Sequence, residues 1–255
     1  MLAAWPRTNY VPGGGPAHVA LVILCQRRLA DPLPISRRAH GMPEGDGAAA
    51  TSIAVRGLEQ DGPAFLTDVV EPFLPLLAND VGEDVAARAA RCAFAYVVTA
   101  ELPDPDDLGH VQAAWAIAKC VCEQADAEVV IDVHAVRAHL AADIAALDPA
   151  RGFEVMSEIS LLFDTMPDGT VAAWTAGLRK FGRPDVVFLD VPSETSVEAA
   201  EQLRDLAELL AAGERIELGD VVASAAGERE ARSLPAERAQ LVDGDALWMA
   251  PHTSR

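Results

Sequence analysis

Apolar runs without a polar interruption mark several candidate buried strands along the chain. The runs are rich in β-branched residues, which is typical of strands that are covered on both faces. The stretch 51–57 instead alternates from residue to residue, as the side chains of a strand do. We therefore predict strands over 18–25, 51–57, 92–99, 128–134 and 185–191.

Apolar residues that recur every three or four positions predict two longer helices. The first follows an acidic turn, in which Asp104 has the position of an N-cap and Pro105 that of the first helical residue. The second begins near Thr195 and Glu198, which fit a capping box, and ends at Gly213. The apolar stripes are Leu108, Val111, Trp115, Ala118 and Cys122 in the first helix, and Ala199, Leu203, Leu206 and Leu210 in the second.

Shorter patterns complete the predicted fold. Helical spacing covers 83–91 and 136–147, and a Pro-Asp-Gly turn between 159–164 and 170–176 predicts a hairpin. Asp243-Gly244 between apolar flanks predicts a second hairpin that closes the chain. Strands beside helices in the first half and hairpins in the second indicate mixed pairing. The predicted fold class is α+β, a layered mixed β-sheet with packed helices.

The domain organisation follows from where proline and glycine gather. Residues 1–16 are rich in both and are expected to form a disordered tail. Three prolines and three glycines within 30–50 predict a long irregular loop. Residues 17–250 are expected to form a single α+β domain. A subdomain boundary near Ala150 stays open, because neither half of the chain shows a clear linker.

The composition is that of a globular protein. The chain has 255 residues, of which 51% are hydrophobic, enough to fill a core. No apolar run approaches the roughly 18 residues that a membrane span needs, and no signal-like segment opens the sequence, so we expect a cytoplasmic protein. The cysteines lie in apolar segments without disulfide or zinc-ligand spacing, and we interpret them as buried thiols: Cys25, Cys92, Cys120 and Cys122.

The charge balance narrows the classes of partner. The formal net charge is −19, and the acidic residues are spread along most of the chain. Such a field repels nucleic acid and anionic membranes and favours a basic protein partner. A simpler alternative is that the acidic surface only keeps an alanine-rich protein soluble.

Asp132 and His134 are the candidate catalytic pair. Residues two apart in a strand share a face, and strand ends are where sites collect in open sheets, so a carboxylate and an imidazole could act together there. The alternative is that these residues are polar because the strand has left the core. The sequence predicts neither a metal site nor a cofactor.

A basic turn between two predicted strands is the candidate binding site. Arg179, Lys180 and Arg183 carry the densest positive charge in the second half of the chain, and Trp174 precedes them. Arginine side chains match carboxylate and phosphate groups, so the turn could bind an anion. The alternative is that it neutralises nearby acidic helices.

The same stretch resembles a known bacterial family. Residues 170–191 are similar in detail to the strand, turn and strand near the C-terminal part of the domain of unknown function 4261 family, and a fainter likeness extends from His18 to about Val222. Trp174 stands where the family pattern has a polar residue, and the loop over 30–50 is atypical. The resemblance implies an α+β domain without an established activity. The matching positions are Thr175, Gly177, Leu178, Phe181, Gly182, Pro184 and Asp185.

Three hypotheses for the function follow. The first is a non-catalytic cytoplasmic binding module, such as an immunity or adaptor protein that neutralises a basic partner. The second is a small hydrolase or metal-dependent enzyme that uses Asp132 and His134, with Arg179 or Arg183 orienting an anionic substrate. The third is a structural subunit of a homo-oligomer.

Overall fold

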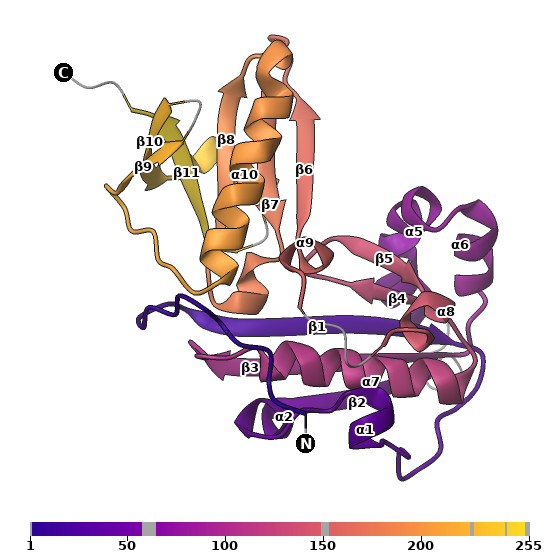
Figure 1. The fold of residues 1–255 in the computed structure, drawn as a ribbon. Coiled ribbons are helices and arrows are strands. Elements are labelled where there is room, and N and C mark those ends of the chain that lie inside the picture. The colour runs from indigo at the N-terminus through magenta and orange to yellow at the C-terminus, as the bar shows by residue number, and fades with distance from the viewer. Residues whose placement is uncertain (1, 58–64, 149–152, 225–226, 243, 253–255) are drawn as a thin grey trace. The chain divides into compact units, whose positions relative to one another are not determined.

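The computed structural model describes residues 2–57, 65–148, 153–224, 227–242 and 244–252. The chain has the predicted α+β fold, and its strands form two sheets where one was expected (Figure 1). Its contacts divide it into two compact units, each with its own sheet. Unit 1 contains Met1–Pro6, His18–Leu102 and Asp107–Phe153, and unit 2 contains Arg7–Ala17, Pro103–Asp106 and Glu154–Arg255.

The sheet of unit 1 has five strands in the order β2-β3-β1-β4-β5. Strand β2 runs antiparallel to β3, and β4 runs antiparallel to both β1 and β5. Four of these strands, β1 to β4, confirm the strands that were predicted from apolar or alternating runs. The strands are β1 (Pro16–Cys25), β2 (Thr51–Gly57), β3 (Phe94–Pro103), β4 (Ala127–Asp132) and β5 (Arg137–Leu140).

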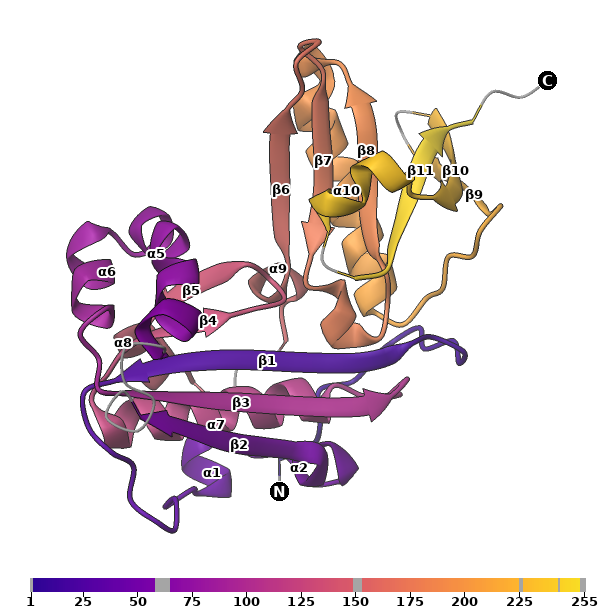
Figure 2. The same cartoon turned by 180° about the vertical axis from the view of Figure 1, so that it is seen from behind.

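Helices cover both faces of this sheet. The long helix α7 packs on the face that carries Leu21 and Ile23 of β1, while α5 and α6 pack against Val22 and Leu24 on the other face. The helix α7 lies in front of the sheet in Figure 1 and behind it in Figure 2, which is seen from the other side. The helical elements are α1 (Arg37–His40), α2 (Asp46–Ala50), η1 (Leu66–Val70), η2 (Glu71–Phe73), α5 (Leu74–Asp80), α6 (Glu83–Ala89), α7 (Gly109–Ala125) and α8 (Ala141–Ala145).

Two predictions for unit 1 were wrong. Asp104 is not the N-cap of α7, which begins at Gly109 after Leu108; Asp104 has a left-handed φ of 34° instead. The helical pattern over 136–147 begins with a strand, because Arg137–Leu140 pairs with β4, and only its second half is helical. Pairing with a strand already in place decided the structure there, against the local periodicity. The predicted irregular loop over 30–50 contains the short helices α1 and α2.

The sheet of unit 2 has six strands in the order β6-β7-β8-β11-β10-β9. Its pairing is mixed, because β11 runs parallel to β8 while the other neighbours are antiparallel. The predicted hairpin of β6 and β7 is confirmed. The strands are β6 (Ser160–Thr165), β7 (Val171–Ala176), β8 (Asp185–Val191), β9 (Val221–Ser224), β10 (Gly227–Ser233) and β11 (Ala246–Pro251).

One long helix and one short one lie on opposite faces of this sheet (Figures 1 and 2). The helix α10 (Ser196–Ala211) contacts β7 and β8 and buries Leu203, Leu206 and Leu210. The helix η5 (Ala236–Leu241) contributes Leu241 to an apolar cluster on the other face. The remaining helical turns are α9 (Val155–Glu158), η3 (Leu178–Phe181) and η4 (Ser193–Thr195).

Two predictions for unit 2 were also wrong. Thr195 makes no side-chain cap on α10, because its hydroxyl donates to the Pro192 carbonyl at 3.1 Å. The chain does not close with a hairpin at Asp243-Gly244: β11 adds beside β8 and pairs with β10, and Asp243 itself lies outside the described residues. None of the described helices is long and apolar enough to cross a membrane.

Candidate functional site

Arg183, a predicted anion-binding residue, is buried and uses its guanidinium within unit 2. Its Nη1 donates to Asp104 Oδ1 at 2.7 Å, and its Nε donates to the Glu214 carbonyl at 2.8 Å. Its Nη2 donates to the carbonyls of Gly213 at 2.6 Å and Val11 at 3.0 Å. Only 4% of the residue is exposed, so the fork that could grip an external anion is already occupied.

Asp104 binds the N-terminal segment with the oxygen that Arg183 leaves free. Its Oδ2 accepts the N–H groups of Gly13 at 2.7 Å and Gly14 at 2.9 Å, and the hydroxyl of Tyr10 at 3.0 Å. Burial alone would raise the pKa of the Asp104 carboxyl, but the hydrogen bonds from Arg183, Gly14, Gly13 and Tyr10 outweigh burial and lower it.

The N-terminal segment therefore does not behave as the predicted disordered tail. Arg7 adds to these contacts, because its guanidinium donates to the carbonyls of Pro105, Leu210 and Ala211. Asn9 N–H also donates to the Ala212 carbonyl at 2.9 Å.

Lys180, the second predicted binding residue, is fully buried. Its Nζ lies 2.7 Å from Glu158 Oε2, and the side chains of the two residues are 0% and 7% exposed. A buried ammonium needs such a partner, since an unpaired charge in the core is costly. Lys180 thus links η3, which follows β7, to the end of α9, which precedes β6, and does not face a ligand.

The buried carboxylate of Asp185 organises the stretch 175–185 through hydrogen bonds. Asp185 Oδ1 accepts the Thr175 hydroxyl at 2.8 Å and the Leu178 N–H at 3.2 Å, while Thr175 Oγ1 accepts the Val186 N–H at 2.9 Å. Burial raises the pKa of Asp185 to about 7, against the opposing hydrogen bonds and the charge of Lys180. In the sequence, Asp185 stands out only as a position that matches the family pattern.

The two glycines of that pattern have backbone conformations that favour glycine. Gly177 has a φ of 120° and Gly182 a φ of 63°. A Cβ on Gly182 would also lie 2.4 Å from the carbonyl oxygen of Gly15, whose N–H donates to the Gly182 carbonyl at 3.0 Å. The turn and the N-terminal segment meet backbone to backbone at this point.

Trp174 and Arg179 are the less buried members of the predicted binding site. Trp174 is half-buried on the face of β7 that η5 covers, where it packs with a cluster that includes Val187 and Leu189. Arg179 is half-buried in η3. The four predicted residues therefore lie near one another in the chain but do not converge on one exposed surface.

The predicted catalytic pair lies in unit 1, at the turn between β4 and β5. Asp132 is 1% exposed, and its Oδ1 accepts the Ala135 N–H at 3.1 Å, a contact that closes the turn. His134 is half-buried in the same turn, and the next residue but one, Val136, has a left-handed φ of 49°. Within the described part of the chain no group of three His, Cys, Asp or Glu residues could hold a metal ion.

Unit 1 contains a partly buried polar network that was not predicted. His40 Nε2 lies 3.0 Å from Glu123 Oε2, and His40 Nδ1 accepts the Ser36 N–H at 2.8 Å. Lys119 Nζ lies 3.0 Å from the other oxygen of Glu123. Burial would raise the pKa of Glu123, but its bonds to Lys119 and His40 lower it. The network fastens α1 to α7, which no local sequence pattern indicates.

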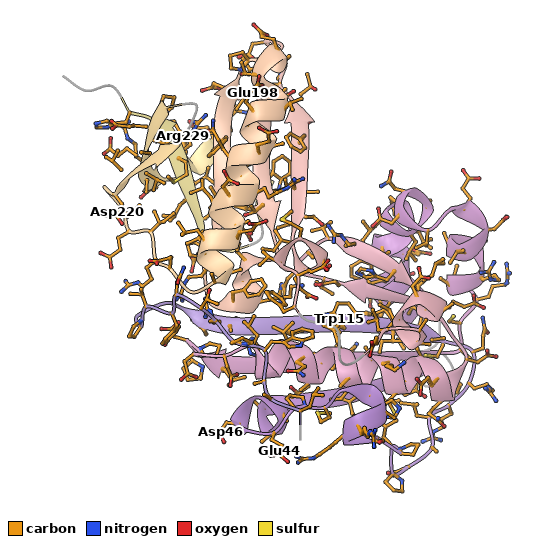
Figure 3. All side chains as sticks on the ribbon, in the orientation of Figure 1. Glu44, Asp46, Trp115, Glu198, Asp220 and Arg229 are labelled. Carbon is orange, nitrogen blue, oxygen red and sulfur yellow. The ribbon has the colours of Figure 1, made fainter. Side chains whose placement is uncertain are left out.

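Exposed carboxylates form a row along α10, and we call this row the acidic ridge. Its members follow at intervals of three, four and three residues, so they share one face of the helix. Figure 3 labels Glu198 close to the start of α10. Among the described residues, none forms an ion pair with the ridge. The acidic ridge consists of Glu198, Glu201, Asp205 and Glu208.

The opposite face of α10 is fixed to the sheet. Besides its buried leucines, Gln202 Oε1 accepts from Arg229 Nε at 3.0 Å, and the Arg229 guanidinium lies 3.9 Å from the centre of the Phe188 ring. Figure 3 shows Arg229 between α10 and the strands beside it. The acidic ridge is thus carried by a helix that is held in place.

Comparison with known proteins adds nothing to this geometry. No family model matches the chain, and neither a curated protein nor a solved structure does.

Proposed function

We propose that the protein is a non-catalytic binding module that holds a basic protein partner on the acidic ridge, as a cytoplasmic immunity or adaptor protein would. The observation that carries the proposal is the row of four exposed carboxylates on one fixed helix, none of which forms an ion pair with a described residue. Unpaired carboxylates attract a basic surface, and the helix that carries them needs no further ordering of its backbone when that surface binds.

The state of the basic turn supports the same assignment. An anion-binding function would need free guanidinium or ammonium groups, but Arg183 and Lys180 are engaged with Asp104 and Glu158 inside unit 2. Asp132 likewise closes a backbone turn. Arg183, Lys180 and Asp132 are therefore used for structure, and most of the charge exposed on α10 is negative.

The resemblance to the domain of unknown function 4261 family remains part of the proposal. Its matching residues have structural tasks here: Thr175 binds Asp185, and Gly177 and Gly182 adopt left-handed backbone. A pattern of this kind marks a common fold and carries no activity with it.

The test is affinity purification from the native host at low and at high salt, followed by mass spectrometry. The ridge variant combines Glu198→Gln, Glu201→Gln, Asp205→Asn and Glu208→Gln. A basic partner that the wild type retains at low salt and loses at high salt, and that the ridge variant does not retain, supports the proposal. An acidic partner, or retention that does not depend on salt, rejects it.

A control variant separates the ridge from net charge. It removes the same number of exposed carboxylates from unit 1, none of which forms an ion pair with a described residue. The control should retain the partner as the wild type does. It combines Asp68→Asn, Glu71→Gln, Glu83→Gln and Asp143→Asn.

A further inference from the structure

The outer edge of β2 is the most open part of the unit 1 sheet. β2 is an edge strand and, among the described strands, pairs with β3 alone, over seven residues without a register shift. The five residues Ser52–Arg56 are all exposed, including Ile53 at 36% and Val55 at 51%. A regular strand edge with exposed apolar side chains is a template for another strand.

The other edge of the same sheet is closed. β5 is short, and the N–H of Ala138 donates to Asp80 Oδ2 of α5 at 2.8 Å. An edge amide is thus satisfied by a side chain of a covering helix, one of the ways in which proteins block unwanted strand pairing. β2 has neither a proline nor a lysine, and its register has no bulge.

The two faces of β2 differ in what they offer. Ile53 and Val55 lie opposite Val98 and Tyr96, which are buried on the face that α7 covers. An added strand could therefore extend this apolar layer with every second side chain. Arg56 lies on the opposite face, at the end of the strand.

The charge near that end selects the partner. Arg56 is exposed and, within the described residues, has no ion pair, and the same holds for Arg28 and Arg91. Arg28 precedes Leu29, whose N–H donates to the Tyr96 hydroxyl, and Tyr96 pairs with Val55. Arg91 lies three residues before Phe94, which pairs with Gly57. The strand pairing therefore puts Arg28, Arg56 and Arg91 at the end of the sheet where β2 ends, and guanidinium groups match carboxylates.

We propose that β2 receives an extended acidic segment of a partner protein, which adds to the sheet as a sixth strand. Its alternate apolar side chains cover Ile53 and Val55, and its carboxylates meet Arg56 and the neighbouring arginines. Recognition by strand addition uses main-chain hydrogen bonds for affinity and alternate side chains for specificity. This surface is separate from the acidic ridge and takes a partner of opposite charge, as an adaptor requires.

The test is a selection of binders from a displayed library of random ten-residue peptides, with the full-length protein as bait. The expected consensus has apolar residues at every second position and at least one Asp or Glu. When the chosen peptide binds, hydrogen exchange should slow at the backbone amides of 52–56. Val55→Lys should weaken binding about tenfold, because it places a charge in the apolar layer.

A charge exchange tests the role of Arg56. Arg56→Glu should lower the affinity for the acidic peptide by up to about fivefold. A peptide with Lys in place of the acidic residue should bind this variant more tightly than it binds the wild type. The ridge variant should bind the acidic peptide as the wild type does, so this result and that of the α10 proposal are independent. Failure to select binders, a consensus without alternation, protection outside β2, or pairing of β2 with a second copy in sedimentation would each overturn the proposal.

Discussion

Arg183 and Asp104 are 79 residues apart in the sequence, yet Arg183 Nη1 lies 2.7 Å from Asp104 Oδ1. The pair joins the turn before β8 to the segment that follows β3, and the other oxygen of Asp104 holds Gly13 and Gly14 of the N-terminal segment. Three distant pieces of chain are thus fixed by one buried ion pair.

Replacing the guanidinium should therefore destabilise the protein. Arg183→Lys keeps the charge but cannot reproduce the five hydrogen bonds that the planar guanidinium donates, and we expect the free energy of unfolding to fall by about 3 kcal/mol. Denaturation in urea, followed by circular dichroism, measures the change. Arg179→Lys, at the half-buried arginine of the same turn, should stay within about 0.5 kcal/mol of the wild type. Equal effects of the two substitutions would contradict the role given to Arg183.

The contact between Gly182 and Gly15 predicts a second stability difference. Gly182→Ala places a Cβ 2.4 Å from the Gly15 carbonyl oxygen, in addition to the left-handed backbone. We expect a loss of about 2 to 3 kcal/mol. Gly169→Ala is the matched control, because Gly169 has a φ of 86° and no atom within 4 Å of the added Cβ. It should lose only about 1 kcal/mol, and a loss as large as that of Gly182→Ala would show that backbone strain alone accounts for both.

The buried Asp185 predicts a pH dependence with a definite sign. Because burial raises the pKa of the folded state to about 7, from an ordinary value of 3.8, the folded protein binds more protons than the unfolded chain between these values. Stability should therefore rise as pH falls from 8 to 5. Relative to Asp185→Asn, which cannot titrate, the wild type should gain about 2 kcal/mol over this range.

Urea denaturation at pH 5, 6, 7 and 8 checks this prediction. Asp168→Asn serves as the control, because hydrogen bonds from Thr170 lower the pKa of the exposed Asp168 and it stays ionised over the whole range. The control should follow the wild type. Parallel curves for the wild type and Asp185→Asn would mean that Asp185 does not titrate between pH 5 and 8.

The strands could be predicted because their signal is local. Continuous apolar runs identified β1, β4 and β8, since a strand buried on both faces needs such a run. Where pairing with a distant strand decides the structure, local reasoning failed. Arg137–Leu140 has helical spacing but pairs with β4, and β11 joins β8 in parallel although a turn-like Asp-Gly precedes it.

The roles of the candidate residues could not be predicted for a related reason. The sequence identifies Arg183 and Lys180 as a basic turn, but their partners Asp104 and Glu158 are separated from them by 79 and 22 residues. Only the three-dimensional contacts show that these charges form ion pairs inside unit 2. The acidic ridge, by contrast, follows from the spacing of carboxylates in a helix that the sequence does predict, although no search for paired catalytic groups would have found it.

The central claim is that the acidic ridge binds a basic partner, and the most direct measurement is the dissociation constant of the retained partner at a series of salt concentrations. The affinity of the wild type should fall steadily as salt increases. At low salt the ridge variant should bind at least about tenfold more weakly, with a shallower salt dependence, while the unit 1 control binds as the wild type does. Equal affinities of the wild type and the ridge variant at low salt would contradict the claim.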